Sequence, residues 1–257
     1  MAAKLHIAVA AHKPYWLPDD PAYLPLHVGA AGRSSLDACG TFTRDDTGEN
    51  ISSRNPNWCE LTGVYWLWKN DTSALTGLVH YRRHFKGSGP RGVATGAELA
   101  AQLETCDVIL PKKRNYLIET TWSQYAHAHH AVDLETTRQI VSERCPGYLG
   151  SFDRVMRARS GHRFNMFVMR RAVFDAYCAW LFDILFELEK RLDISAYSPY
   201  DARVFGFVSE RLLDVWLGCQ NLRLAERPVV HLEGQNWPVK IARFLKRKFW
   251  PSHARAS

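Results

Sequence analysis

Short apolar runs alternate with longer amphipathic segments along this chain. Residues 5–10 and 75–79 are brief apolar runs containing β-branched side chains, a pattern that predicts buried strands. Residues 172–192 repeat large apolar side chains at the spacing of one helix face, which predicts a long amphipathic helix. The same reasoning predicts strands over 107–110 and 164–169, and helices over 57–70, 98–104, 122–131, 134–145 and 200–217. Alternating strands and helices predict an α/β fold with a central, mostly parallel sheet.

Three segments depart from this alternation. Prolines at positions 14, 18, 21 and 25 predict a loop after the first strand, and the polar residues 32–55 predict an irregular segment that lies over a ligand. From residue 238 the chain becomes basic and aromatic, with apolar and cationic side chains on separate faces of an expected helix. Such a helix suits either an anionic membrane surface or a docked position with solvated lysines. We therefore divide the chain into a domain over residues 1–237 and a tail over 238–257.

The predicted strand 75–79 leads directly into His80, Tyr81, Arg82 and Arg83. Ligands of open α/β sheets bind outside the carboxyl ends of the strands, so this cluster is expected where a ligand would lie. Adjacent guanidinium groups favour an anionic ligand, because their geometry matches phosphate oxygens and their charge is permanent. In a continuous strand Arg82 and Arg83 would point to opposite faces, so both reach one ligand only if the chain turns there. The alternative is that one pairs with a surface carboxylate and the other is solvated.

The charge balance also favours anionic partners. Thirty-three Lys and Arg against 26 Asp and Glu leave a formal charge of +7, which suits nucleic acid, a sugar nucleotide or an anionic membrane. Lys112, Lys113 and Arg114 form a second basic cluster after the predicted strand 107–110. We interpret this cluster as a solvated loop, with contact to a substrate phosphate as the alternative.

The cysteines and the amino terminus indicate a reducing, cytoplasmic setting. Six scattered cysteines include no Cys-x-x-Cys pair, so they do not predict a metal framework. The first residues lack the apolar core of a signal peptide, and no run approaches the roughly 20 apolar residues of a spanning helix. We expect a cytoplasmic protein.

One segment is rich in metal-ligand side chains. His127, His129, His130 and Asp133 lie close in sequence, and on a helix His129 or His130 would share a face with Asp133. No His-Glu-x-x-His pattern is present, and isolated histidine clusters are often surface features. A metal site there is the alternative to our expectation of no metal.

Several long strings of mixed polarity resemble the DUF4422 family of bacterial capsule and O-antigen glycosyltransferases, some of which are galactofuranosyltransferases. The matching strings cover residues 7–14, 46–52, 57–70, 77–83 and 203–212, and the resemblance extends over nearly the whole chain, from about Leu5 to Leu217. The resemblance implies a GT-A-like nucleotide-sugar fold. It also implies transfer of a hexosyl unit, galactofuranose, from a UDP-sugar to a lipid-linked glycan, with inversion. Lipid-linked acceptors favour the membrane interpretation of the tail, and hence peripheral association with the inner face of the membrane.

Most GT-A enzymes hold the donor diphosphate through a metal ion bound by Asp-x-Asp, and this sequence contains no such motif. We expect Arg82 and Arg83 to stabilise the leaving group instead, without Mn²⁺ or Mg²⁺. His12 and Lys13 follow the first strand, where a GT-A fold accommodates the nucleotide. Asp46 and Asn50 are candidates for contacts with uracil or ribose, although Asx residues also cap turns.

The resemblance implies sugar or acceptor contacts from His129 and Asp133. Asn165 resembles a residue of the strand that holds the sugar in related folds, with a structural role as its alternative. Glu60 is expected either to pair with Arg82 or Arg83 or to line the sugar pocket.

An inverting transfer needs a base to deprotonate the acceptor hydroxyl, and a carboxylate usually does this. Glu210 is the first candidate and Asp201 the second. An ion pair of Glu210 with Arg203 or Arg211 is the structural alternative.

Two other classes of function compete with this interpretation. The charge and aromatic content also suit a nucleic-acid-binding protein, but no helix-turn-helix, zinc-finger or RNP string is present, and we expect no nucleic-acid partner. A metal hydrolase built on His127 to Asp133 is the third possibility.

Overall fold

The structure is a computed structural model of the chain, and it describes residues 4–36 and 41–233. The predicted basic helix of the tail lies outside these residues. Within them, no helix is both long and apolar enough to cross a bilayer.

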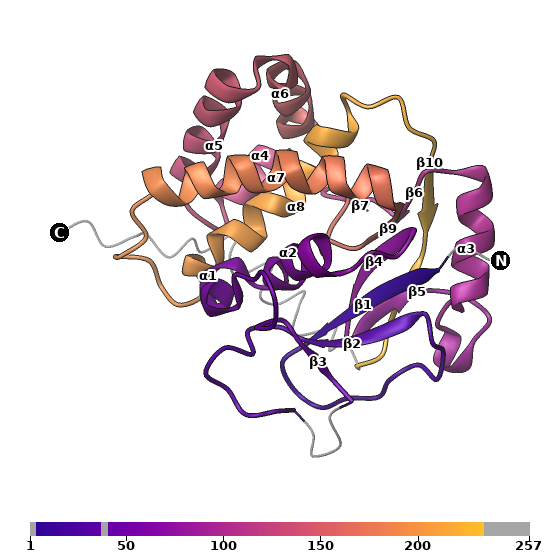
Figure 1. Cartoon of the computed structure of the whole chain (residues 1–257). Helices are drawn as coiled ribbons and strands as arrows, with labels where there is room; N and C mark the ends of the chain where they lie inside the picture. Colours follow the sequence, from indigo (N-terminus) through magenta and orange to yellow (C-terminus); the bar gives the residue numbers. More distant parts are fainter. Residues whose placement is uncertain (1–3, 37–40, 234–257) are drawn as a thin grey trace.

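Nine strands of the described residues form one mixed sheet (Figure 1). Seven of them lie in the order β10-β6-β9-β4-β1-β2-β3, and all of these run in the same direction except β9. The short strand β5 pairs with the end of β4 and with β11. The strands are β1 Leu5–Ala11, β2 Tyr23–His27, β3 Thr43–Arg44, β4 Leu75–His80, β5 Arg83–Phe85, β6 Val108–Pro111, β9 Phe167–Arg170, β10 Leu224–Arg227 and β11 Val229–His231. The prediction of an α/β fold with a central, mostly parallel sheet is confirmed.

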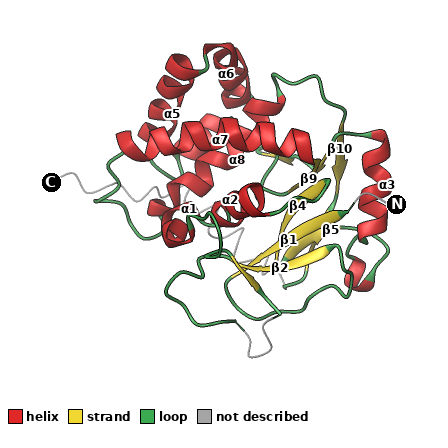
Figure 2. Ribbon diagram, in the orientation of Figure 1, coloured by secondary structure: helices red, strands yellow, loops and turns green. Residues whose placement is uncertain are grey.

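Helices cover both faces of the sheet (Figure 2). One face carries α3 Gly96–Thr105, and the other carries most of the helical mass, including the long helix α7. That helical layer consists of α1 Asn55–Trp58, α2 Leu61–Asn70, α4 Thr121–Ala126, α5 Ala131–Arg144, α6 Leu149–Arg157, α7 Arg171–Arg191 and α8 Val204–Leu217. A separate two-stranded ribbon pairs β7 Arg114–Asn115 with β8 Ser160–Gly161.

The alternation of β1 separates two hydrophobic cores. Ala8 and Ala10 face the core beneath the large helical layer, while Ile7 and Val9 face the core beneath α3. Because strand side chains alternate, one buried strand supplies both cores. The predicted strand 5–10 therefore reads as uniformly apolar although its two faces pack against different partners.

Two predictions of local structure were wrong. Residues 57–70 do not form one helix, because the chain breaks at Cys59, whose φ is 53°. The segment expected to be a proline-rich loop contains β2, in which Pro25 pairs with Val9 of β1. The ladder between β2 and β3 begins only at Leu26, so the missing N–H of Pro25 breaks no bond with β3.

Gly77 allows β4 and β9 to approach closely at the centre of the sheet. A Cβ at this position would lie 2.9 Å from the carbonyl oxygen of Phe167 and 3.0 Å from a methyl of Val168. We predict that Gly77→Ala lowers stability by about 1–3 kcal/mol, because backbone in the middle of a sheet must shift. Thermal denaturation would show a fall of several degrees, at about 2–4 °C per kcal/mol for a chain of this size.

Gly147→Ala is the matched control, because a Cβ there meets no atom within 4 Å. Equal melting temperatures for the Gly77 and Gly147 variants would contradict the close approach of the two strands.

Candidate active site

Strand β4 ends in a tight turn that carries the two adjacent arginines. His80 pairs with Arg83 across the turn, so Tyr81 and Arg82 form its tip and β5 begins at Arg83. The chain therefore turns where both arginines could reach one ligand. The Arg82 side chain is 45% exposed, and its nearest carboxylate is that of Glu233, at 4.0 Å.

Arg83 is held in an unusual electrostatic state. Its guanidinium lies over the ring of Phe164, 4.4 Å from the centroid, and its Nε is buried with no hydrogen-bond partner among the described residues. Burial lowers the pKa of Arg83, and the charge of Arg82 lowers it further. Arg83 is partly buried, and no carboxylate of the described residues forms an ion pair with it, although the charges of Glu210 and Glu60 partly oppose the lowering of its pKa.

Four cationic side chains lie close enough to His12, at the carboxyl end of β1, for their charges to act on it. Partial burial lowers the pKa of His12, and the charges of Lys13, Arg82, Arg33 and Arg203 all lower it further. These residues come from four segments: the end of β1, the turn after β4, the loop after β2, and the residue before α8. The strands β1, β2 and β4 are parallel neighbours, so their carboxyl ends meet at one edge of the sheet. We call His12, Lys13, Arg33, Arg82 and Arg203 the cationic cluster.

Little negative charge faces this cluster. Among the described residues, the ion pairs of Lys13 (2.8 Å) and Arg82 (4.0 Å) both go to Glu233, and neither Arg33 nor Arg203 forms one. Arg203 directs its Nε to the sulfur of Cys59, at 3.1 Å. The cluster thus carries a surplus of positive charge that suits an anion with several oxygens.

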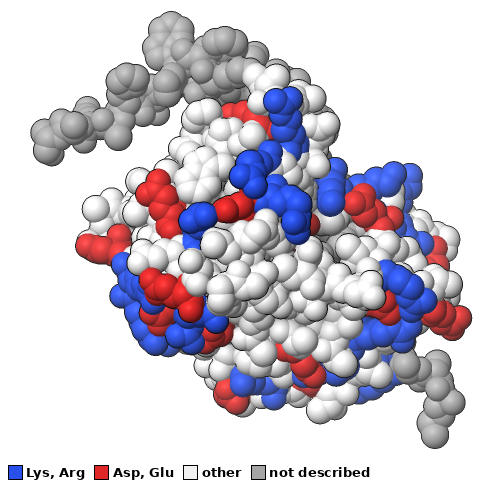
Figure 3. Space-filling view, turned by 90° about the horizontal axis from the view of Figure 1, so that it is seen from above, with Lys and Arg blue, Asp and Glu red and all other residues white. Residues whose placement is uncertain are grey.

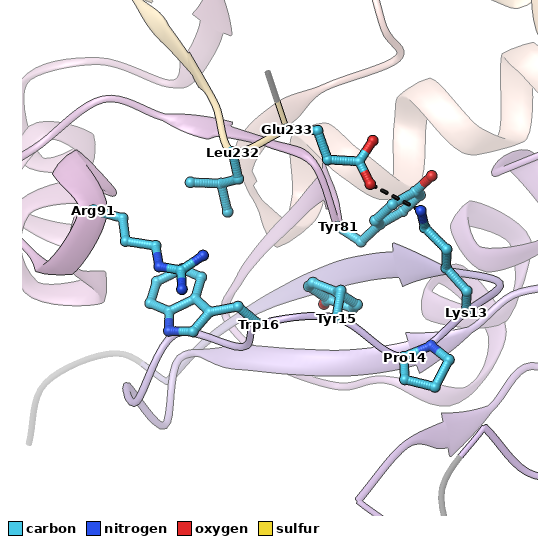
Figure 4. Close-up of a pocket in the computed structure, with 8 residues that line it drawn as sticks. All are labelled: Lys13, Pro14, Tyr15, Trp16, Tyr81, Arg91, Leu232 and Glu233. Carbon is cyan, nitrogen blue, oxygen red and sulfur yellow. Dashed lines mark hydrogen bonds and ion pairs between the residues drawn. The ribbon is translucent and has the colours of Figure 1, made fainter. Parts of the chain in front are cut away.

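A pocket of about 240 Å³ adjoins the cationic cluster (Figure 4). Aromatic walls come from Tyr15, Trp16 and Tyr81, and Arg91 lies over the Trp16 ring at 4.8 Å. Lys13 lines the pocket and also belongs to the cluster, with its Nζ 5.0 Å from the centre of the Tyr81 ring. The buried hydroxyl of Tyr15 has no partner among the described residues. The pocket therefore offers aromatic stacking surfaces beside the cations.

A buried polar network supports the turn from below. Phe164 and Asn165 are successive residues with left-handed backbone, at φ 77° and 51°, a conformation that costs non-glycine residues energy. The Nε2 of His80 donates to the carbonyl of Phe164 at 2.5 Å, and the N–H of Phe164 donates to Glu210 at 3.1 Å. The same segment whose ring underlies Arg83 is thus fastened to β4 on one side and to α8 on the other.

Glu210 lies in this network between two arginines. Its Oε2 is 2.9 Å from Arg211 and 3.4 Å from Arg163. Burial alone would raise the pKa of Glu210, but the two guanidinium groups and the Phe164 N–H hold it below its ordinary value. The ion pair with Arg211 that we considered as the structural alternative is present, and Arg163 is a partner that the sequence did not indicate.

Two predicted ligand contacts are buried and fully engaged. The Asn165 side chain is 3% exposed and bonds to Glu60 (2.7 Å), the Gly206 carbonyl and Ser209. Asp133 is 1% exposed and accepts hydrogen bonds from Tyr125 and Tyr197, both at 2.7 Å. These positions do not support direct contact with a sugar, because the Asn165 and Asp133 side chains are already hydrogen-bonded to groups inside the protein. Glu60 accepts from Asn165 and forms no ion pair with Arg82 or Arg83, so the predicted pairing was wrong.

Asp46 and Asn50 lie in the loop that follows β3. Arg44 holds the Asp46 carboxylate at 2.7 Å and lowers its pKa. Asn50 caps a turn, donating to the Gly48 carbonyl and accepting from Ser52. The turn-capping alternative therefore describes Asn50, and Asp46 is committed to Arg44.

His129 and Asp201 form a second polar pair at the edge of the helical layer. The His129 ring stacks between Tyr200 and Phe207, and its Nδ1 lies 3.4 Å from Asp201. Burial and the charge of Arg211 lower the pKa of His129 to about 4, so the ring is neutral at pH 7. Asp201 is 24% exposed, and Arg203 of the cationic cluster follows it by two residues.

The histidines of residues 127–130 do not form a metal site. α4 ends at Ala126 and α5 begins at Ala131, so the histidines occupy a turn instead of one helix face. His127 pairs with Glu119, His129 with Asp201, and Asp133 with two tyrosines. Within residues 4–36 and 41–233, no group of three His, Cys, Asp or Glu side chains is arranged to hold a metal.

Comparison with known proteins identifies the family. The profile described as "Domain of unknown function (DUF4422)" matches residues 6–221. The chain belongs to the DUF4422 family. The match contains every predicted site residue from His12 to Glu210, whereas the pocket residues Leu232 and Glu233 lie beyond it.

The DUF4422 chain is also similar to a solved structure described as the WbbM bifunctional glycosyltransferase in its apo form. The two share 28% sequence identity with a TM-score of 0.80, over 90% of this chain and 46% of that one. The chain thus spans about half the length of the protein it matches. No match was found among curated protein sequences.

The depressed pKa of His129 predicts a stability loss in mild acid. The His129 imidazole binds a proton near pH 6.5 in the unfolded chain but only near pH 4 in the folded chain. The stability that the neutral ring contributes is therefore complete above pH 6.5 and falls as the pH drops towards 4. The difference corresponds to on the order of 3 kcal/mol. In His129→Phe, which keeps an aromatic ring between Tyr200 and Phe207, we expect a correspondingly flatter pH dependence.

Urea denaturation at several pH values between 4 and 7 measures this effect. His84 is also buried with a pKa lowered to about 4, but it contributes equally to both proteins and cancels in the comparison. Parallel curves for the wild type and His129→Phe would contradict a buried, neutral His129.

Proposed function

We propose that this DUF4422 protein is a glycosyltransferase that moves a hexosyl unit, galactofuranose, from a UDP-sugar to a lipid-linked glycan in capsule or O-antigen synthesis. The observation that carries the proposal is the gathering of four cations around His12 at the carboxyl ends of β1, β2 and β4. Its fold matches part of a solved bifunctional glycosyltransferase, which supports the same class of reaction. The pyrophosphate of a sugar nucleotide carries negative charge that would balance the cluster, and its oxygens have the geometry that the cations can bind.

The donor pyrophosphate binds the cationic cluster in this proposal. Arg82 at the turn tip and Arg203 before α8 approach it from different elements, and Arg83 adds a buried charge behind the turn. An aromatic or sugar ring of the donor stacks in the adjoining pocket beside Lys13. The end of β4 and the turn after it carry His80, Tyr81, Arg82 and Arg83, which are not the oxygen ligands that Mn²⁺ or Mg²⁺ prefers, so no metal is included in the reaction.

The acceptor binds on the side of His129 and Asp201. We assign the base to Asp201, our second candidate from the sequence, and a positioning role to Glu210. Glu210 has a lowered pKa, accepts two hydrogen bonds and forms an ion pair with Arg163, which makes it a weak proton acceptor. Asp201, by contrast, is partly exposed and adjoins a neutral histidine.

The transfer is a single inverting displacement. The acceptor hydroxyl oxygen attacks the anomeric carbon from the face opposite the phosphate, and its proton passes to Asp201. The bond between the anomeric carbon and the phosphate oxygen breaks, and its electron pair leaves with UDP. Guanidinium groups stabilise the charge that develops on the departing pyrophosphate.

We place the protein in the cytoplasm, peripherally on the inner face of the membrane, with the tail 238–257 contacting anionic lipid. A nucleic-acid partner is not favoured by the face seen in Figure 3, where Lys and Arg are interspersed with Asp and Glu. Nucleic acid is bound by basic stripes of a single sign.

The cationic cluster predicts binding of UDP-sugars without metal. In a thermal-shift and calorimetric screen, UDP, UDP-galactopyranose and UDP-galactofuranose should bind equally well with Mn²⁺ or with EDTA. Arg82→Gln and Arg203→Gln should each weaken binding about tenfold or more, since charge-assisted hydrogen bonds contribute about 1.5–3 kcal/mol. Arg157→Gln, an exposed arginine of α6, is the matched control. Binding that requires Mn²⁺, or that ignores both cluster variants, would reject the arrangement.

The assignment of the base predicts different kinetics for two acidic residues. Asp201→Asn should reduce kcat about a hundredfold or more while UDP affinity is retained, because proton transfer contributes roughly 10²–10⁴-fold. Glu210→Gln should impair donor binding as well, because it loosens Phe164 beneath Arg83. Release of UDP from UDP-galactofuranose with membrane-extracted acceptor measures both. Full turnover in Asp201→Asn would exclude it as the base.

A further inference from the structure

The loop between β7 and α4 presents two large aliphatic side chains to solvent. Leu117 is 72% exposed and Ile118 is 64% exposed, the two highest values among the exposed large hydrophobic residues of the described chain. They are adjacent and lie at the tip of the connection between Asn115 and Thr120. Single exposed apolar residues are ordinary, but two neighbouring aliphatic side chains at a loop tip need a reason.

Leu117 also adopts a backbone conformation that its side chain disfavours. Its φ is +62°, in the left-handed region that costs a residue with a Cβ roughly 1–2 kcal/mol. Neither burial nor backbone preference therefore explains a leucine at this position. Strain retained at an exposed residue is a reason to look for function.

Hydrogen bonds on both sides of the loop hold its tip in place. The N–H of Tyr116 donates to the Arg159 carbonyl at 2.8 Å, and Arg114 pairs with Gly161 in the ribbon. Beyond the tip, Thr120 and Ser123 form a capping box that begins α4. The side chains of the tip are consequently held outward before any partner arrives, which reduces the entropy lost on binding.

Cationic side chains flank the tip. Lys112 and Lys113 are exposed, and neither forms a salt bridge within the described residues. Apolar side chains at a protruding point beside free lysines match the two layers of an anionic bilayer, its acyl boundary and its phosphate plane. Two side chains are too few for a stable protein interface, which needs about 800 Å² from each partner.

The loop is also rooted in the candidate active site. Tyr116 accepts a hydrogen bond from Arg163 at 3.2 Å, and Arg163 is one of the two arginines beside Glu210. The loop also follows the carboxyl end of β6, which runs in the same direction as β4, so its base lies at the edge of the sheet where the candidate site is built.

We propose that the loop of residues 112–118 is a membrane contact: Leu117 and Ile118 enter the boundary of an anionic bilayer, and Lys112 and Lys113 bind lipid phosphate. This contact is distinct from the tail 238–257. The inference rests on the proposed function for its setting, since a lipid-linked acceptor is reached at a membrane. Vesicle binding without donor or acceptor tests it separately from sugar transfer.

The experiment is co-sedimentation of the full chain with phosphatidylcholine vesicles, with and without phosphatidylglycerol. Leu117→Ser/Ile118→Ser should weaken partition to the anionic vesicles about tenfold or more and at every salt concentration. Lys112→Gln/Lys113→Gln should weaken it about fivefold per lysine at low salt, with the difference lost at high salt. Melting temperatures should not change, because all four side chains are exposed.

Matched variants test whether the effect depends on where the substituted side chains lie or only on their residue type. Val132→Ser/Leu224→Ser removes two other exposed apolar side chains, and Lys86→Gln removes another exposed lysine; both should bind as the wild type does. Unchanged partition in the Leu117/Ile118 variant would overturn the proposal and leave the tail as the membrane contact. Absence of vesicle binding by the wild type, with self-association that the Leu117/Ile118 variant abolishes, would overturn it in favour of a contact between protein copies.

Discussion

The carboxylate of Glu210 connects the sheet to the helical layer at the point where the candidate site is built. It receives the N–H of Phe164 from the segment before β9 and lies against Arg163 of that same segment and Arg211, its neighbour in α8. Removing one partner of such a buried charge group costs about 3–5 kcal/mol, because the other charges remain buried and unbalanced. His80 fastens the opposite edge of Phe164 to β4, so two successive left-handed residues are held from both sides. The position of Arg83 over the Phe164 ring depends on this arrangement.

Positive charge is gathered in front of this network without matching negative charge. The Lys13 and Arg82 side chains share the carboxylate of Glu233, and the partly buried Arg83 forms no ion pair among the described residues. Burial lowers the pKa values of His12 and Arg83 most, and the neighbouring like charges lower both further, so those charges add to the free energy of the unliganded protein. A ligand with several anionic oxygens would remove this unfavourable electrostatic free energy on binding, and the fold therefore favours such ligands.

The elements of the fold follow from local patterns, whereas the site follows from contacts that no local pattern contains. Period-two and helical repeats located β1, β4, β9 and α7 within a few residues, because each element buries a continuous apolar face. Arg33 and Arg203 were missed as site residues because they reach His12 only after β2 and α8 pack beside β1 and β4. Asn165 and Asp133 show the converse limit: residue type indicates polarity but not burial, and both side chains are buried and hydrogen-bonded inside the protein. The break at Cys59 was equally hidden, since the sequence there reads as one apolar helix.

Glu233 links these observations to the region beyond the family match. Its carboxylate lies on Lys13 and near Arg82, which are the side chains assigned to the donor's pyrophosphate, and it also lines the aromatic pocket. A carboxylate in this position satisfies two cations in the unliganded protein, at contacts that are half-exposed and therefore individually weak. An incoming pyrophosphate carries more charge and more acceptor oxygens than one carboxylate, so it would bind the same cations more strongly than Glu233 does. The displacement of Glu233 from Lys13 would open the side of the pocket formed by Leu232 and Glu233, so that binding the anion and admitting the ring attached to it become one event.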